Sequence, residues 1–579
     1  MKTARGVGQS HRRLLRLQQR IFHSLQESAE TLLGKPPASI LRYEREYLAD
    51  FRGLRARAPL RQLSKGELIG AIREADVTFI ADYHTFGQAQ RTALRLIRDS
   101  HRAGETWEIG LEMFSSDCQP ALDEFSAGRI GESEFLRAVR YESQWGFSWR
   151  NYRPLFEWAK QNSVPLLALN MPDEGVRAAR DEDRELEARD EWAVDCIVKR
   201  LSGRKGPRQT RVGRSVRDLD LTEIPATARM IVLYGEMHVG QKHLPAALKR
   251  ADKRRRLRSV TIHQNNDKLY WELAREGQER DTSAVHLSGH TYCVISGTPW
   301  AKLQSLISWA ENEQEVDVEE GEPHDYLSSM RLYGEAISEF LRIPAPSFEA
   351  LTAKTLQEAD FVDSLAEVGH FTRLELEIIR AQVADNERLY VSRLALAYLA
   401  TPSQNRIAEL SAIHVLRTRT DSLDLFRGTP EDFFRICIEA CFGFFGSLII
   451  NPRRKCDLPA DLARKLLGRA TPREKKAREL SMRLLGGESG RPVTAAGLRS
   501  AVGTARLGAY AWNAARYAGQ ILGQQLYQAL LAEEISADLI IDHCLLPATP
   551  GPRVYQGHYL ALVKSVNPGP AGGSKSHVF

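Results

Sequence analysis

Two segments of the chain each end an apolar run with an acid, one intervening residue and a histidine. The first segment is TFIADYH, which ends in Asp82 and His84, and the second is IVLYGEMH, which ends in Glu236 and His238. Side chains two residues apart lie on the same side of an extended chain. We therefore expect the carboxylate and the imidazole of each pair to face a common site.

Two further apolar runs end in polar residues of the same kind. The run TWEIGLEMF reaches Glu112, and the run VPLLALN ends at Asn170. Ligands of open α/β sheets bind beyond the carboxyl ends of the strands. The sequence therefore predicts a single ligand-binding rim, and it carries Asp82, His84, Glu112, Asn170, Glu236 and His238.

Such a rim suits two kinds of chemistry. The four residues His84, Glu112, Glu236 and His238 could hold a divalent metal ion, which would activate a bound water molecule as a nucleophile. Alternatively, one carboxylate and one histidine act as general acid and base without a metal. If the protein is an enzyme, these four residues are the candidate catalytic groups. A histidine that merely hydrogen-bonds its neighbouring acid is the plainer alternative, and the repetition of the pattern at two strand ends makes it the less favoured one.

The elements that must position these residues alternate between strands and helices. Helical patterns such as Gly87–Arg102, Pro154–Asn162 and Glu174–Leu201 separate short apolar runs. The predicted strands are Val77–Ala81, Trp107–Leu111, Leu166–Leu169, Met230–Tyr234, Ser259–Ile262, Ala284–Leu287 and Tyr292–Ile295. Because parallel strands need crossover connections, this alternation predicts an α/β domain with a mostly parallel sheet flanked by helices.

Changes in composition divide the chain further. We expect a helical N-terminal arm at 1–60, the α/β ligand-binding domain at 61–310, an acidic linker at 311–325, a mainly α-helical domain of unassigned role at 326–565 and a flexible tail at 566–579. The linker sequence ENEQEVDVEEGEPHD is crowded with acids, which is typical of an exposed segment.

Composition excludes several classes of protein. The 579 residues are 43% apolar and 27% charged, and the net charge is +6, which excludes a mostly disordered, collagen-like or polytopic membrane protein. The run Ile436–Ile450 contains Glu439 and is too short to span a bilayer, so it is predicted to be a buried helix.

Composition and motifs also bear on location and partners. Seven scattered cysteines, with no signal peptide and no lipobox, favour a cytoplasmic location. Basic runs at 199–214 and 249–258 lack any DNA- or RNA-binding motif, so no nucleic-acid partner is expected.

A family resemblance covers roughly residues 70–300. The stretches ADYHTFGQAQRTALRLI, GLEMFSSDCQPALDEFSAGRI, QWGFSWRNYRPLFEWAKQNSVPLLALNMP and LYGEMHVG resemble, in order and spacing, the bacterial ChaN-like haem-binding-uptake family of the Tiki superfamily. The family's first motif has Gly-Glu where this chain has Ala81-Asp82, and the shorter Asp82 carboxylate reaches less far.

The resemblance implies both a ligand and a set of pocket residues. It implies a ChaN-like fold and a small-molecule ligand, haem or iron, with a divalent metal ion as the alternative for a Tiki-type peptidase. A metal-free, esterase-like hydrolase of the same superfamily is a further alternative. The departure at Asp82 favours a last alternative, in which the protein is a non-catalytic interaction protein. The pocket positions carried over are Asp82, His84, Glu112, Trp145, Tyr152, Asn170, Glu236 and His238.

Overall fold

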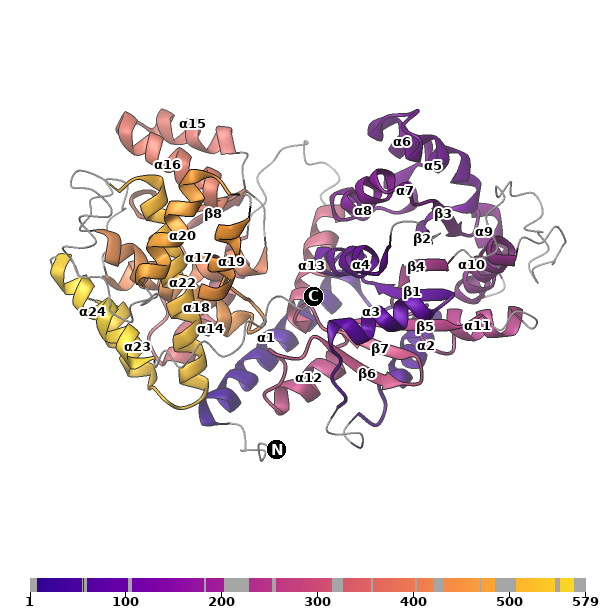
Figure 1. Cartoon of the computed structure of the whole chain (residues 1–579), viewed down its shortest axis with the longest axis horizontal. Coiled ribbons are helices and arrows are strands. Elements are labelled where there is room, and N and C mark those ends of the chain that lie inside the picture. The colour runs from indigo at the N-terminus through magenta and orange to yellow at the C-terminus, as the bar shows by residue number, and fades with distance from the viewer. Residues whose placement is uncertain are drawn as a thin grey trace. The chain divides into compact units, whose positions relative to one another are not determined.

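The chain forms two compact units, which are described here one at a time. The computed structural model describes residues 8–54, 56, 60–102, 107–181, 184–202, 229–252, 257–314, 326–355, 358–400, 403–420, 432–468, 470–484, 507–546 and 552–566. One unit comprises residues 22–316, and the other comprises residues 1–21 with 317–576 (Figure 1). Most of the predicted linker at 311–325, most of the basic run at 199–214 and nearly all of the predicted tail lie outside the described residues.

The N-terminal helices bury apolar and aromatic side chains. Helix α1 (Gln9–Leu33) carries a stripe of buried leucine and isoleucine side chains, which must be covered by other apolar surface. Within the helical unit, Gln18 Nε2 donates to the Ile449 carbonyl at 3.0 Å. Within the α/β unit, the Phe22 and Trp271 rings lie 5.6 Å apart. Helix α2 (Ala38–Tyr47) buries Tyr43 and Tyr47 in the α/β unit.

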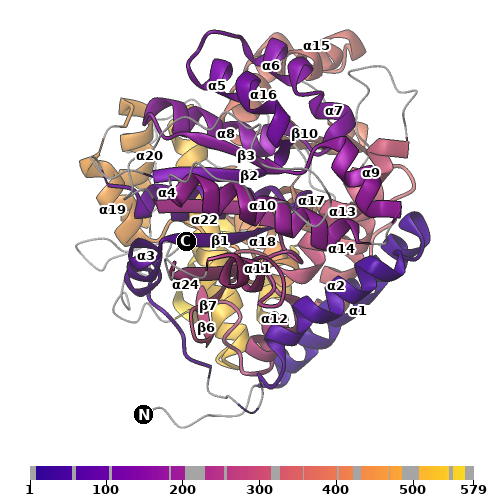
Figure 2. The same cartoon turned by 90° about the vertical axis from the view of Figure 1, so that its right-hand side faces the viewer.

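The α/β unit contains the predicted, mostly parallel sheet. Its strands are β1 (Val77–Asp82), β2 (Trp107–Ser115), β3 (Leu166–Asn170), β4 (Arg229–Gly235), β5 (Ser259–Gln264), β6 (Ala284–Ser288) and β7 (Thr291–Val294). They pair in the order β3-β2-β4-β1-β5-β7-β6 (Figure 1; Figure 2 shows β1, β2 and β3 from another side), and every neighbouring pair is parallel except β6 with β7. All residues of β1 are buried, as expected of a central parallel strand covered on both faces.

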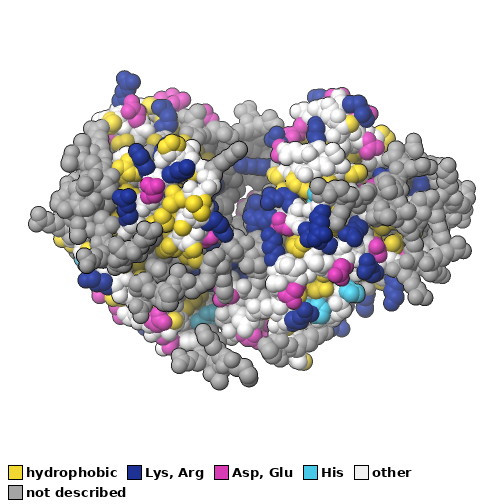
Figure 3. All heavy atoms as spheres, in the orientation of Figure 1, with side chains coloured by type: hydrophobic (Ala, Val, Ile, Leu, Met, Phe, Trp, Pro, Cys, Tyr) yellow, Lys and Arg dark blue, Asp and Glu magenta, His cyan; other side chains and the backbone are white. Residues whose placement is uncertain are grey.

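Helices cover both faces of this sheet. They are α3 (Lys65–Glu74), α4 (Gly87–Ser100), α5 (Gln119–Ser126), α6 (Glu132–Ala138), α7 (Tyr141–Gln144), α8 (Trp149–Gln161), α9 (Asp173–Asp181), α10 (Glu185–Ser202), α11 (Leu244–Ala251), α12 (Asp267–Arg275) and α13 (Pro299–Gln314). The predicted helix Glu174–Leu201 is two helices, α9 and α10. Arg91 and Arg98 of helix α4 are exposed. Lys and Arg side chains gather on part of the visible face of this unit (Figure 3).

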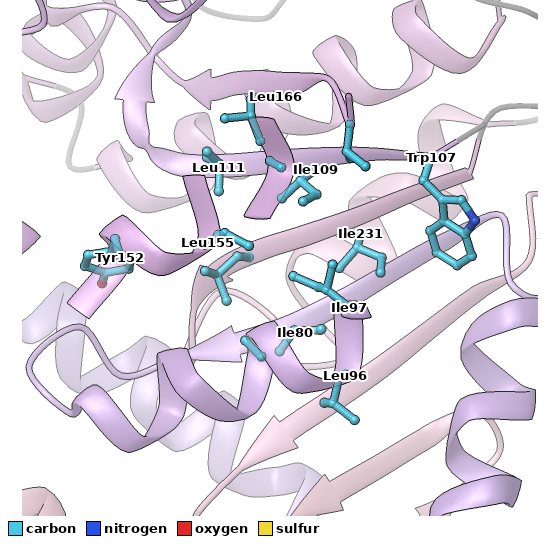
Figure 4. Close-up of a cluster of buried hydrophobic side chains, with 14 of the residues drawn as sticks. Ile80, Leu96, Ile97, Trp107, Ile109, Leu111, Tyr152, Leu155, Leu166 and Ile231 are labelled. Carbon is cyan, nitrogen blue, oxygen red and sulfur yellow. The ribbon is translucent and has the colours of Figure 1, made fainter. Parts of the chain in front are cut away.

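Strand alternation decides which face each residue of β1 serves. Ile80 packs with Ile97 of α4 and Leu155 of α8 in one core cluster, which Figure 4 shows between the sheet and these helices. Phe79 and Ala81 belong to the other cluster, together with side chains of α10 and α11. Because side chains of a strand alternate, Asp82 leaves β1 on the side of α4 and α8.

The other unit is mainly helical, as predicted, and contains a small sheet that the sequence did not indicate. Its helices include α14 (Leu327–Leu341), α15 (Glu358–Val368), α16 (Arg373–Asn386), α17 (Gln404–Thr420), α18 (Phe433–Ile450), α19 (Pro459–Leu467), α20 (Pro472–Leu484), α22 (Ala509–Leu531), α23 (Ala537–Cys544) and α24 (Pro552–Ser565). The strands β8 (Thr352–Thr355), β9 (Arg388–Val391) and β10 (Leu396–Leu399) pair in the order β8-β10-β9. Each strand has four residues, too few to display a clear alternation of polar and apolar side chains.

Helix α18 is the central helix of this unit. By length and composition it is, among the described residues, the helix that could cross a membrane, yet 83% of that stretch is buried within the fold. Two glycines of α22, Gly519 and Gly523, allow this helix to pack closely on α18. A Cβ atom at either position would lie only 2.3 or 2.4 Å from a carbonyl oxygen of α18. The burial agrees with the prediction of a buried core helix.

A carboxylate between arginines lies in the interior of the helical unit. Glu409 of α17 is 1% exposed and forms ion pairs with Arg388 and Arg454. Burial by itself raises the pKa of Glu409, but the two guanidinium groups outweigh burial and lower it to about 2. The carboxylate therefore stays ionised in the folded protein at every pH above about 2.

We expect Glu409→Gln to destabilise the helical unit by about 3 kcal/mol at pH 7, because two buried guanidinium groups lose their shared partner. The pKa of Glu409 in the folded protein, about 2, lies below the value of about 4.3 for an unfolded chain. The stabilisation from Glu409 is therefore complete above pH 4.3 and is lost as the pH falls towards 2. Urea unfolding followed by circular dichroism should show the difference between wild type and variant narrowing over that window.

The exposed pair Arg373–Glu377 offers a matched control. Glu377→Gln should change the free energy of unfolding by less than about 0.5 kcal/mol. A difference between wild type and Glu409→Gln that is constant from pH 5 to pH 2.5 would contradict the assignment.

Candidate functional site

The carboxylate of Asp82 is buried at the end of the central strand. It is 3% exposed, and three donors converge on it. His84 Nδ1 lies 3.0 Å and the Tyr152 hydroxyl 2.6 Å from Oδ2, while Gln90 Nε2 lies 2.5 Å from Oδ1. A buried carboxylate needs such donors in place of water. Asp82 therefore fixes side chains from the loop after β1, from α4 and from α8.

Tyr152 acts in this arrangement as a permanent hydrogen-bond donor. Its side chain is fully buried, and burial followed by the Asp82 charge raises the pKa of its hydroxyl well above the usual value. The hydroxyl therefore remains protonated and donates to Asp82. The family resemblance implied Tyr152 as a pocket position, and in the structure its hydroxyl donates to Asp82.

The imidazole of His84 joins the first and second strand ends. Because an ionised carboxylate only accepts, His84 donates to Asp82 through Nδ1, which leaves Nε2 facing Glu112 Oε2 at 3.7 Å. Burial by itself lowers the pKa of His84, but the hydrogen bond to Asp82 and the charges of Glu112, Asp82 and Glu236 raise it overall. The side chain of His84 is 22% exposed, so solvent reaches part of it.

Gly235 at the end of β4 allows this approach. Its backbone N–H donates to Glu112 Oε2 at 2.5 Å. A Cβ atom at this position would lie 3.2 Å from Glu112 Oε2 and 3.3 Å from His84 Nε2. The glycine therefore leaves room for the carboxylate and the imidazole to meet over the strand end.

Aromatic rings border His84. The Trp145 and Phe147 rings lie 4.4 and 4.9 Å from the imidazole, and the Trp309 ring of α13 lies 5.0 Å from Phe147. Trp309 Nε1 donates to the Gly146 carbonyl at 3.2 Å, which ties α13 to this border. Trp145 Nε1 is buried and has no hydrogen-bond partner within the described part of the chain. The border thus combines flat apolar surface with one unused donor.

The second strand-end histidine has an aspartate partner of its own. His238 Nδ1 lies 2.7 Å from Asp190 Oδ1 of α10, and the Tyr43 hydroxyl donates to Asp190 Oδ2 at 2.9 Å. Burial by itself lowers the pKa of His238, but the Asp190 charge raises it overall. At 7% exposure, His238 is much less accessible than His84.

Glu236 is held by a lysine rather than aimed at a histidine. Lys302 Nζ of α13 lies 3.1 Å from both carboxylate oxygens of Glu236. Burial by itself lowers the pKa of Lys302, but the carboxylates of Glu236 and Asp267 raise it overall, so the lysine stays charged. The predicted pairing of Glu236 with His238 across two residues is therefore replaced by an ion pair with α13.

The structure gathers only part of the predicted rim. Asp82, His84, Glu112, Trp145 and Tyr152 form one connected group. Asn170, whose strand is separated from β1 by β2 and β4, accepts instead from the adjacent Met171 N–H at 2.9 Å.

The predicted four-residue metal set is not brought together. Across the described ranges, no group of three or more His, Cys, Asp or Glu side chains is placed to hold a metal ion. The physical reason is that Glu236 and His238 are already satisfied by Lys302 and Asp190.

Several partners in the site carry no recognisable signal in the sequence. Asp190 lies in an acid-rich helical stretch, and Lys302 stands in a mainly apolar one, so neither is distinguishable from an ordinary surface residue. Tyr43 comes from α2, far from the motifs. Gln90 lies within the stretch ADYHTFGQAQRTALRLI, to which the sequence assigned no role beyond the family resemblance.

Asp82→Asn should lower the pKa of His84. The variant removes the charge that faces Nδ1, so we expect a fall of about 1 to 3 units from a wild-type pKa above 6.5. Imidazole ring signals in NMR spectra of histidine-labelled protein, followed through a pH titration, measure the change. Asp123→Asn, at an exposed position of α5, is the control and should leave the His84 titration unaltered. An unchanged His84 titration in Asp82→Asn would refute the pairing.

Comparison with known proteins finds one family model that matches part of the α/β unit. Residues 68–209 match the family model described as haem-binding uptake, Tiki superfamily, ChaN. No curated protein matches the chain. A solved structure titled "Cofacial heme binding to ChaN of Campylobacter jejuni" is 14% identical over 41% of this chain and 92% of that chain, with a TM-score of 0.28. The matched residues include Asp82, His84, Glu112, Trp145 and Phe147, so this part of the α/β unit is similar to the haem-binding-uptake ChaN family of the Tiki superfamily.

Proposed function

We propose that the α/β unit binds haem at His84. The observation that carries this proposal is the state of the His84 ring. Nδ1 is engaged by Asp82, the ring is 22% exposed, and Trp145 and Phe147 lie within 5 Å of it. A histidine whose other nitrogen donates to a carboxylate has the orientation that iron ligation uses. The family model adds the ligand class.

The residues around His84 fit such a ligand. Flat aromatic surfaces suit a planar macrocycle, and the unused Trp145 Nε1 donor suits a carboxylate at its edge. Tyr152 is not the iron ligand in this proposal, because its buried hydroxyl donates to Asp82. When bound, haem supplies an iron centre that a neutral imidazole nitrogen can ligate.

Asp82 and Glu112 have distinct parts in this proposal. Asp82 holds the ring and keeps the proton on Nδ1, so that Nε2 is the nitrogen available to a ligand. Glu112, 3.7 Å away, stabilises the protonated ring and so competes with binding. Binding through Nε2 therefore requires loss of a proton, and the affinity should rise with pH through the raised pKa of His84.

A haemin titration tests the proposal. The full-length protein should shift the Soret band on adding haemin, and His84→Ala should weaken binding at least tenfold. His290→Ala, at an exposed turn, is the matched control and should bind as wild type.

The same haemin titration at several pH values distinguishes binding of the iron by His84 from non-specific adsorption of haemin. Wild-type affinity should increase with pH, whereas the residual affinity of His84→Ala should not. Equal affinity for haemin in wild type and His84→Ala would overturn the proposal.

A second candidate is a metal-free hydrolase, which one observation favours. Asp82, His84 and Glu112 form a line of carboxylate, imidazole and carboxylate, with contacts of 3.0 and 3.7 Å. A histidine held in this way can act as a general base with a raised pKa. Glu236 is not part of this candidate site, because Lys302 holds it.

Hydrolysis of p-nitrophenyl acetate in the presence of a chelator tests this candidate. We expect His84→Ala and Glu112→Gln each to lower kcat by about 100-fold, because each removes a member of the acid–base pair. Activity that both variants retain at the wild-type rate would exclude it.

A further inference from the structure

A cavity lies within the helical unit, well apart in the sequence from the family-matched residues. Its volume is about 150 Å³, and its walls come from α16, β9, α17, α18 and α22. Ile436 and Trp512 contribute apolar surface, and arginines contribute much of the polar surface. A cavity of this size is known to admit a single benzene ring.

Three arginines and three acids line this cavity, and around one of the acids, Glu409, the guanidinium groups outnumber the carboxylates. Glu409 is shared by Arg388 and Arg454, so one negative charge faces two positive ones. Arg516 of α22, which also lines the cavity, interacts electrostatically with both Arg388 and Glu409. The group around Glu409 therefore has three guanidinium groups for one carboxylate.

The remaining acids at the cavity do not make up the difference. Glu439 pairs with Arg417 at 2.8 Å, and Asp385 pairs with Arg473. Each of these pairs is balanced one to one, so neither acid is available to Arg516.

Arg516 is the guanidinium group that lacks an acidic partner. Within the described ranges it forms no ion pair, its guanidinium group interacts with the neighbouring Tyr517 side chain, 5.7 Å from the ring centre, and its buried Nε has no hydrogen-bond partner. Burial, followed by the charge of Arg388, lowers the pKa of Arg516 to about 10. Positive charge at a partly dry cavity is stabilised by an anion, and a guanidinium group binds carboxylate and phosphate in a bidentate manner.

We propose that this cavity binds a small organic anion, with a carboxylate or phosphate head at Arg516 and an apolar body of about one ring against Trp512 and Ile436. Both head groups carry negatively charged oxygen atoms that accept hydrogen bonds from a guanidinium group. The site is independent of His84, because no cavity-lining residue belongs to the α/β unit.

Calorimetric titration of the full-length protein with benzoate, phenyl phosphate and benzyl alcohol tests the proposal. At least one of the two anions should bind with a dissociation constant in the millimolar range or below, and the neutral alcohol should bind at least tenfold more weakly. Which anion binds better identifies the head group.

Arg516→Gln should weaken binding of that anion at least tenfold. Because the substitution removes one of three positive charges around Glu409, the free variant should unfold at the same temperature as wild type or higher. Arg373→Gln, whose side chain is 95% exposed, is the matched control and should bind as wild type.

Three results would overturn the proposal. They are no binding of either anion to wild type, equal binding of the anions and benzyl alcohol, and unchanged anion binding by Arg516→Gln. The comparison of the two anions with benzyl alcohol uses wild-type protein alone, so it tests the proposed anion site even if Arg516→Gln folds poorly.

Discussion

The buried carboxylate of Asp82 is the group on which the candidate site depends. An unpaired carboxylate inside a protein costs several kcal/mol, so three donors must reach it. These donors come from the loop after β1, from α4 and from α8, and all three lie on the face of the sheet to which strand alternation turns Asp82. Satisfying one charge therefore fixes the ring of His84, buries the hydroxyl of Tyr152 and anchors two helices.

The short side chain of Asp82 reaches the histidine two residues along its own chain. The second histidine is oriented in a similar way, but by Asp190 of a helix distant in sequence. Both histidines pair with an aspartate and they differ in exposure, since 22% of the His84 side chain is exposed against 8% of the His238 side chain. Of the two, His84 is therefore the more accessible to solvent.

The helical unit solves the burial of charge in a different way. Glu409 is surrounded by more guanidinium groups than it can neutralise, and the excess lies at a cavity rather than in close-packed core. Packed interiors seldom leave buried polar groups without partners. Excess positive charge beside a cavity is therefore more typical of a ligand-binding site than of a purely structural core.

The sequence by itself determined the seven strands of the α/β unit, because continuous apolar runs ending in polar residues are strong signals of buried parallel strands. It also predicted that Asp82 and His84 lie together, and they do, although β1 ends at Asp82 and His84 lies in the turn that follows. Only the tertiary structure decided that Lys302 holds Glu236 and that Asp190 holds His238. These partners come from helices far along the chain, and no local pattern distinguishes a buried lysine or aspartate from a solvated one. The short strands β8 to β10 and the arginine surplus around Glu409 were decided in the same way, by contacts between residues that are distant in the sequence.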